Sequence, residues 1–272
     1  MTTTDTTNPA VPGPGGAAGR EPVVSIRGVK KTYYTKDSAV EALQAVDLDI
    51  HAGQFISFVG PSGCGKSTLL NLMSALLEPT AGEILFEGKP LREPSRDIGI
   101  MFQSAVLLPW RTIENNAILP SEVAGADLDA ARKRVSVLLD KVGLADFRKA
   151  YPHQLSGGMQ QRASLARVLS TQPKMLLMDE PFGALDEFTR EAMNLELLAI
   201  TEGTDMVVGF VTHNISEAVF LADRVVVMSP RPGRVSGVID VDLPRPRSIQ
   251  SMQEQRFTDL VFEVRATLGG HA

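Results

Sequence analysis

Residues 60–68 read GPSGCGKST and match the phosphate-loop pattern G-x-x-x-x-G-K-[ST]. A short apolar run at 55–59 precedes this stretch, and apolar residues at helical spacing follow it at 69–76. This is the strand, loop and helix context that a phosphate loop requires. Its three glycines let consecutive backbone N–H groups turn toward one anion at the positive end of a helix.

The residue types in this stretch indicate what each would do. The Lys66 ammonium would reach the outer phosphates of a nucleotide, and the Ser67 hydroxyl would ligate magnesium. The alternative is a glycine-rich turn with no ligand, but the flanking pattern favours nucleotide binding. We therefore expect contacts with the nucleotide from Gly60, Pro61, Ser62, Gly63, Cys64, Gly65, Lys66, Ser67 and Thr68.

Composition limits the class of protein. A chain of 272 residues with 43% hydrophobic residues can form one large domain, or one domain with a subdomain. A net charge of −5 gives no general attraction to nucleic acid. No apolar run approaches the roughly 20 residues of a membrane-spanning helix, and no signal pattern opens the chain. We therefore expect a soluble protein that stays in the cytoplasm, and the single cysteine fits a reducing compartment.

The first part of the chain predicts a tail followed by strands. Residues 1–20 are mostly Thr, Pro, Gly and Ala, and we expect them to be a disordered tail. From residue 23 onward, apolar residues at period two predict strands around 24–26 and 46–50. Tyr33 lies between these strands, where its ring could stack on a nucleotide base or cover a sheet face.

The middle of the chain predicts two more strands and then a helical insert. Strands are expected at 82–88 and 97–102, the second of which leads into Gln103. Helices are expected at 112–124 and 127–142. The sequence LSGGMQQR at 155–162 then opens another helix, whose start carries the candidate phosphate ligands Ser156, Gly157 and Gly158. The alternative is a serine cap with a flexible entry.

Acidic and imidazole side chains follow the later strands. The apolar run at 175–178 is closed by Asp179 and Glu180. Asp179 would hold magnesium through its water shell, and Glu180 would orient or deprotonate an attacking water. Another buried strand, at 206–211, is followed by His213. A histidine in that position is more often a surface residue, but ligands of parallel sheets bind at the carboxyl ends of strands.

The motifs, taken in order, resemble the ATP-binding subunit of an ABC transporter. These are GPSGCGKST, Gln103, LSGGMQQR, MLLMDEP, Ala184-Leu185-Asp186 and His213, of which LSGG separates this family from other phosphate-loop proteins. The resemblance implies an α/β phosphate-loop NTPase core with an antiparallel β subdomain and an inserted α-helical subdomain. The ATPase domain would span 21–250, with the helical subdomain at about 104–165 and a final helix within 251–272. Asn214 and Gly183 depart from common family residues, away from the expected chemistry.

The same resemblance implies site roles and a dimer. Two copies would sandwich two ATP molecules head to tail, each held by the phosphate loop of one copy and the Ser156, Gly157, Gly158 segment of the other. Tyr33 would stack on adenine, and Asp186 would link the two sites across the dimer. Gln103 would contact magnesium and sense a membrane subunit. Glu180 would polarise water and His213 would contact the γ-phosphate.

Two stretches narrow the resemblance further. LLPWRT at 107–112 and SPRPGR at 229–234 are similar to the nitrate, sulfonate and taurine type of importer ATPase. The implied function is ATP hydrolysis, with Mg²⁺, that drives uptake of a small solute through a separate membrane permease fed by an external solute-binding protein. The protein would then lie on the cytoplasmic face of the membrane. The alternatives are the ATPase of another ABC importer group or of an exporter, or an ABC ATPase unrelated to transport.

Overall fold

A six-stranded sheet forms the centre of the computed structural model, which describes residues 21–36 and 38–269. The predicted tail at 1–20 lies outside the described residues. The strand order is β10-β9-β3-β8-β7-β6, and every neighbouring pair is parallel except β9 and β10. The strands are β3 (Phe55–Val59), β6 (Ile98–Met101), β7 (Met175–Asp179), β8 (Val207–Val211), β9 (Arg224–Met228) and β10 (Val235–Asp240).

The parallel strands are apolar at almost every position because both faces of this sheet are covered. Side chains alternate between the faces along each strand. In β3, Ile56 and Phe58 pack toward α1 (Lys66–Met73) and a second sheet, whereas Phe55 and Val59 pack toward helices on the other side. The carboxyl ends of the five parallel strands therefore meet at one edge, where the phosphate loop begins.

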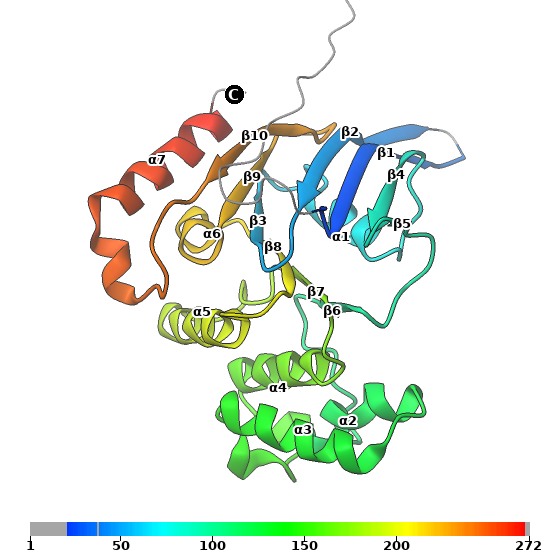
Figure 1. Ribbon diagram of the computed structural model, residues 1–272, viewed down its shortest axis with the longest axis vertical. Coiled ribbons are helices and arrows are strands. Elements are labelled where there is room, and N and C mark those ends of the chain that lie inside the picture. The colour runs from blue at the N-terminus through cyan, green and yellow to red at the C-terminus, as the bar shows by residue number, and fades with distance from the viewer. Residues whose placement is uncertain (1–20, 37, 270–272) are drawn as a thin grey trace, which may run out of the picture.

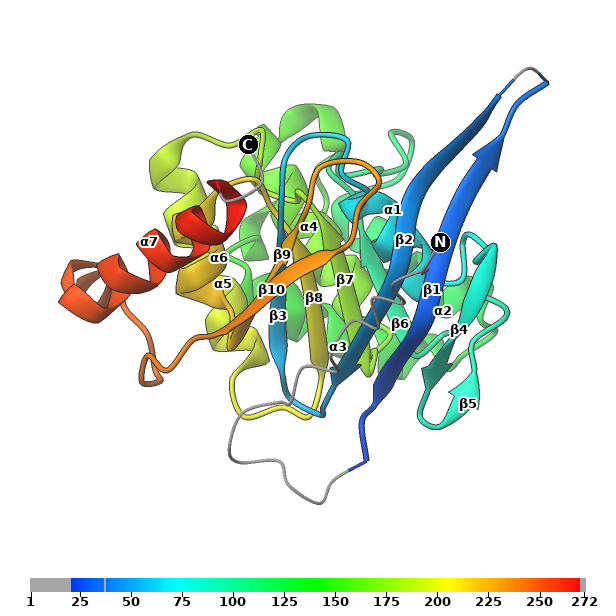
Figure 2. The ribbon, with the colours of Figure 1, turned by 90° about the horizontal axis from the view of Figure 1, so that it is seen from above.

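The second sheet is antiparallel, with strand order β2-β1-β4-β5 (Figures 1 and 2). Helix α1 lies between the two sheets, where its leucines share one buried cluster with apolar residues of both. The strands are β1 (Val24–Tyr34), β2 (Ala39–Ile50), β4 (Ala81–Phe86) and β5 (Lys89–Pro90).

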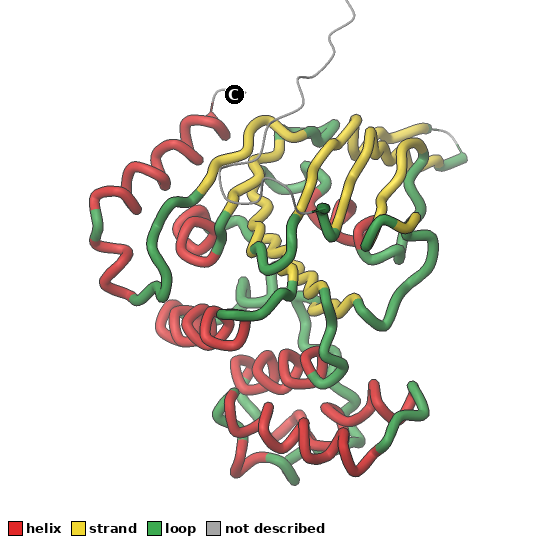
Figure 3. The backbone as a smooth tube through the Cα atoms, viewed as in Figure 1, coloured by secondary structure: helices red, strands yellow, loops and turns green. Residues whose placement is uncertain are grey.

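Three helices between β6 and β7 form a separate layer, seen at the bottom of Figures 1 and 3. They are α2 (Ile113–Val123), α3 (Leu128–Lys141) and α4 (Gly157–Leu169), with the short 3₁₀ turns Ala145–Phe147 and Pro152–Gln154 between α3 and α4. Thr112 and Asp127 cap α2 and α3 by accepting hydrogen bonds from backbone N–H groups. We call α2, α3 and α4 the helical layer.

The remaining helices cover the face of the large sheet that lies opposite α1. They are α5 (Glu187–Thr201), α6 (Ile215–Leu221) and α7 (Gln255–Gly269), and α7 follows the 3₁₀ turn Ile249–Gln253. Helix α6 packs on β3 and β9, and α7 packs on α6, β9 and β10. Within 21–36 and 38–269, no helix has both the length and the apolar character needed to cross a bilayer.

Candidate functional site: a nucleotide site at the sheet edge

The phosphate loop joins β3 to α1. Gly63 and Gly65 have φ angles of 74° and 102°, in the left-handed region that glycine tolerates. A side chain at Gly65 would also collide with Leu43, because an added Cβ would lie 2.6 Å from Leu43 Cδ2. Lys66 Nζ donates to the carbonyl oxygens of Gly60 at 2.8 Å and Pro61 at 3.2 Å. The carbonyl groups of the loop therefore hold the ammonium group of the loop's own lysine.

Ser67 connects the loop to β7. Its hydroxyl donates to Asp179 Oδ1 at 3.0 Å, so two of the three predicted magnesium ligands are in direct contact. Burial raises the pKa of the Asp179 carboxyl, and the hydrogen bond from Ser67 partly offsets the rise. Asp179 is half-buried, and a cation beside this carboxylate would favour its ionised form.

The backbone turns at Glu180, directly after β7 ends at Asp179. Glu180 has a φ of 44°, an unusual value for a residue other than glycine, and its N–H donates to the Val211 carbonyl at 2.9 Å. This turn brings Glu180 Oε2 within 3.4 Å of His213 Nδ1. The predicted water-activating carboxylate and the predicted γ-phosphate contact, which are 33 residues apart, therefore meet where the adjacent strands β7 and β8 end.

Tyr33 lies beside the start of α1. Its hydroxyl is 3.3 Å from Thr68 Oγ1, and Lys31 Nζ is 5.4 Å from the centre of its ring. The residue is 39% exposed. Stacking of the Tyr33 ring on a nucleotide base stays a prediction.

The Ser156 segment and Asp186 lie side by side, on the first turns of α4 and α5. Ser156 Oγ caps α4 by accepting from Met159 N, and Asp186 caps α5 by accepting from both N and Oγ1 of Thr189. An added Cβ on Gly158 would lie 2.7 Å from Thr189 Cγ2, whereas one on Gly157 would meet nothing within 4 Å in the described chain. No hydrogen bond or ion pair between described residues joins either segment to the phosphate loop of the same chain.

Gln103 follows β6 and is exposed. Its carbonyl accepts from Gln161 Nε2 at 2.6 Å, which ties it to α4 of the helical layer. The backbone of Gln103 is thereby fixed between the sheet and that layer.

Sequence analysis missed two sets of contacts around the loop. The segment 229–234 packs against the back of the phosphate loop, where Arg231 Nε donates to the Gly63 carbonyl at 3.3 Å. Behind His213, Thr212 bonds to the buried Glu217. No local signal predicts the first contact. For the second, the sequence Asn214-Ile-Ser-Glu217 indicates the cap of a helix by Asn214, but it does not predict the bond between Thr212 and Glu217.

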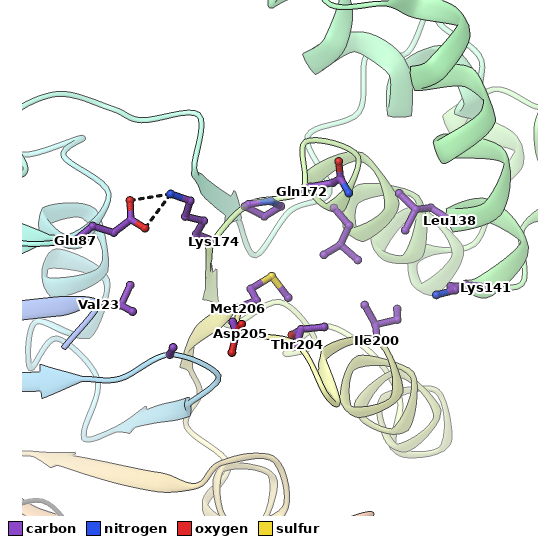
Figure 4. Close-up of a pocket in the computed structure, with 13 residues that line it drawn as sticks. Val23, Glu87, Leu138, Lys141, Gln172, Lys174, Ile200, Thr204, Asp205 and Met206 are labelled. Atoms are coloured by element: carbon purple, nitrogen blue, oxygen red, sulfur yellow. Dashed lines mark hydrogen bonds and ion pairs between the residues drawn. The ribbon is translucent and has the colours of Figure 1, made fainter. Parts of the chain in front are cut away.

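A cavity of about 680 Å³ lies at the opposite edge of the sheet (Figure 4). Its lining includes Lys174, which precedes β7 and bonds to Glu87, and Met206, which precedes β8. It lies at the amino ends of the strands and includes no residue of the nucleotide site.

The fold and the site define a phosphate-loop nucleotide-binding protein with a helical layer inserted in its core. Residues 43–183 match the ABC transporter family. The chain is 44% identical to the taurine import ATP-binding protein of Rhizobium johnstonii, over 84% of this chain and 89% of the relative. It is 43% identical to a nitrate import ATP-binding protein of Synechococcus elongatus, over 83% and 84%.

A solved structure is also similar. It is a dimeric ATP-binding cassette in a post-hydrolysis state with ADP and inorganic phosphate, which is 34% identical with a TM-score of 0.72 over 80% of this chain and 98% of that one. The chain therefore belongs to the ABC transporter family and is one of its ATPases. The predicted fold class and the resemblance to the nitrate, sulfonate and taurine group are confirmed.

Proposed function

We propose that this protein is the ATP-hydrolysing subunit of an importer for a small solute of the nitrate, sulfonate or taurine kind. Four residues of the predicted chemistry meet at one sheet edge, where the adjacent strands β3, β8 and β7 end: Lys66, Asp179, Glu180 and His213. This observation supports ATP hydrolysis. The relatives are named as import proteins for taurine, aliphatic sulfonates and nitrate, and these names support import as the direction and a small solute of that kind as the cargo. The protein would act at the cytoplasmic face of the membrane.

The residues of this chain divide the work. The Lys66 ammonium and the N–H groups of the loop hold the phosphates and stabilise negative charge that develops on them. The Glu180 carboxylate orients the attacking water and accepts its proton. His213, which faces the same carboxylate, contacts the terminal phosphate.

Magnesium fits the oxygen atoms of this site. Ser67 Oγ and Asp179 Oδ1 are in contact at the mouth of the loop, and Mg²⁺ is commonly held by one or two such oxygens together with phosphates and waters. When bound, the ion would neutralise charge on the phosphates. Gln103 is the third proposed contact of this ion.

A second copy would complete each site. Ser156 and Gly157 start α4 with an open surface, and their free N–H groups suit a phosphate of the partner's nucleotide. Asp186 lies beside them and would link the two sites. Two similar solved cassettes are dimeric, which supports a pair of copies; the head-to-tail arrangement is part of the proposal.

The permease would bind where the helical layer meets the edge of the sheet. A groove of about 570 Å³ lies between the edge strand β6 and α2, with Arg96, Arg134 and Arg167 in its lining. Arg167 NH1 also donates to the Val106 carbonyl at 2.7 Å, within the segment that leads to Trp110. Trp110 is 71% exposed, which argues against a core role for it and favours contact with a partner.

Glu180→Gln tests the assignment. The amide keeps the shape of the carboxylate but cannot accept a proton, so ATP binding should persist while turnover falls at least about 100-fold. ATP should then trap a dimer that size-exclusion chromatography detects. Glu254→Gln, which alters an exposed acid before α7, is the matched control. A Glu180→Gln protein that hydrolyses ATP at the parental rate would refute the role.

A further inference from the structure

A closed ring of three hydrogen bonds joins Thr212 and Asn214, the neighbours of His213 in the chain, to Glu217. Thr212 Oγ1 donates to Glu217 Oε2 at 2.6 Å, and the Asn214 N–H donates to Thr212 Oγ1 at 3.0 Å. The Glu217 N–H in turn donates to Asn214 Oδ1 at 3.1 Å. The residues on both sides of His213 are thus fixed to the first turn of α6, while the His213 side chain is 64% exposed.

The carboxylate in this ring is costly to bury. Glu217 is 7% exposed, and its Oε1 has no hydrogen-bond partner among the described residues. Burial raises the pKa of the Glu217 carboxyl, and the hydrogen bond from Thr212, the Asn194 side chain and the charges of Arg190 and His213 partly offset the rise. Asn214 caps the helix without help from this carboxylate. Stability of α6 alone therefore gives no reason for a buried acid here.

Helix α5, which Asp186 caps, packs on α6. Asn194 of α5 is buried, as Glu217 is, and Asn194 and the charge of Arg190 lower the pKa of the Glu217 carboxyl. Arg190 NH1 donates to the Leu185 carbonyl at 3.4 Å, and the same guanidinium pairs with Glu187. Glu217 is therefore placed between the His213 loop and the start of α5.

We propose that Glu217 is a positioning residue for ATP hydrolysis: through the Thr212 hydroxyl it holds His213 where it faces Glu180 and the terminal phosphate. This role rests on the proposed ATPase function. Glu217 does not contact the nucleotide; it sets the backbone from which His213 projects. Loss of the bond should therefore lower the rate of the chemical step and leave ATP affinity nearly unchanged.

Four variants test the proposal by steady-state ATPase kinetics and ATP binding on the full chain. Glu217→Ala and Thr212→Val each remove one end of the bond, and each should lower kcat about tenfold while KM and Kd for ATP change less than about twofold. Glu217→Gln keeps an acceptor oxygen and Thr212→Ser keeps the hydroxyl, so both should remain within about threefold of the parent. The double variant Thr212→Val, Glu217→Ala should be no slower than Thr212→Val alone, because Thr212→Val already removes the bond to Glu217 together with the one from the Asn214 N–H.

Arg224→Ala is the matched control for lost stability. Arg224 is buried at the amino end of β9, where it donates to the Asp49 carbonyl, so its loss should lower the melting temperature without the selective fall in kcat. A parental kcat in Glu217→Ala or Thr212→Val would overturn the proposal. So would multiplying effects in the double variant, or no rescue by Glu217→Gln and Thr212→Ser. If Glu217→Ala does not fold, the Thr212 pair decides.

Glu180→Gln is assayed in parallel. If it retains turnover, the assignment of the site fails and this proposal fails with it. If Glu180→Gln is inactive while Glu217→Ala is fully active, only the positioning role is refuted.

Discussion

Gly233→Ala should detach the segment 229–234 from the phosphate loop. An added Cβ at Gly233 would overlap with the Cys64 carbonyl and lie 3.1 Å from Leu43 Cδ2. The backbone on both sides is also fixed: Gly233 N–H donates to the Ala42 carbonyl, and Gln44 N–H donates to the Gly233 carbonyl, both at 2.9 Å. Since the obstacle is backbone, no side-chain rotation relieves the overlap, and the segment must move.

The size of the effect follows from those two hydrogen bonds. Each contributes about 1 kcal/mol, and more where a freed group stays buried, so the free energy of unfolding should fall by about 2 to 4 kcal/mol. That loss lowers the urea midpoint by about 1 M for a slope near 3 kcal/mol/M. Affinity for ATP should fall as well, because the Cys64 carbonyl belongs to the loop.

Urea denaturation followed by circular dichroism measures the first effect, and titration calorimetry measures ATP binding. Gly237→Ala is the matched control on the next strand, because its added Cβ would meet only Thr267 Cγ2, at 2.9 Å, a side-chain end that can shift. We expect it to cost less than about 1 kcal/mol. A Gly233→Ala protein as stable as this control would refute the packing described for segment 229–234.

Three other substitutions test the site and its surface. Lys66→Ala removes the cation of the loop and should weaken ATP binding by at least about tenfold in calorimetry; unchanged affinity would contradict its role. Burial raises the pKa of the Asp179 carboxyl, so the folded protein binds a proton here at a higher pH than the unfolded chain does. Above this raised pKa the ionised carboxyl destabilises the folded state, and the loss of stability disappears as the pH falls through that pKa. Asp179→Asn should therefore raise the melting temperature of the nucleotide-free protein at neutral pH while abolishing ATPase activity, and a lowered melting temperature would contradict this. Trp110→Ala, at an exposed position, should leave the melting temperature and basal ATPase unchanged while stimulation by the permease falls in reconstituted vesicles; normal stimulation would contradict a role in docking.

Continuous apolar runs were enough to predict the core strands. β7 and β8 lie within one residue of the expected ranges, because a strand covered on both faces is apolar throughout. The strand expected at 97–102 is shorter and ends at Met101, with Phe102 41% exposed. A β-prone residue at a strand end does not reveal whether another chain segment covers it.

The candidate residues were predictable where a motif names them, and their contacts were not. The turn at Glu180 needs a positive φ, which nothing in the sequence MLLMDEP indicates. The contact of Arg231 with Gly63 joins residues 168 positions apart, so only the paired strands β3 and β9 bring them together. A local sequence pattern indicates what chemistry a side chain can do. The residues that it contacts depend on the order of the strands in the sheet, which the local pattern does not give.

Helix α4 physically joins the two surfaces proposed for partners. Its first turn carries Ser156 and Gly157, which would hold the nucleotide of a second copy. Two of its side chains bond to the segment 103–106, which leads to the groove proposed for the permease. Gln161 donates to the Gln103 carbonyl at 2.6 Å, and Arg167 donates to the Val106 carbonyl at 2.7 Å.

Gln161 and Arg167, which donate these bonds, lie six positions apart on the 13-residue helix α4, or about 9 Å along its axis at 1.5 Å per residue. A shift of its amino end toward a second copy must either carry the segment 103–106 with it or break both bonds. Bonds to backbone carbonyls do not depend on the side chains of the segment 103–106, so on the proposed function Val106 and Trp110 would be free to match a particular permease while these bonds to α4 stay the same.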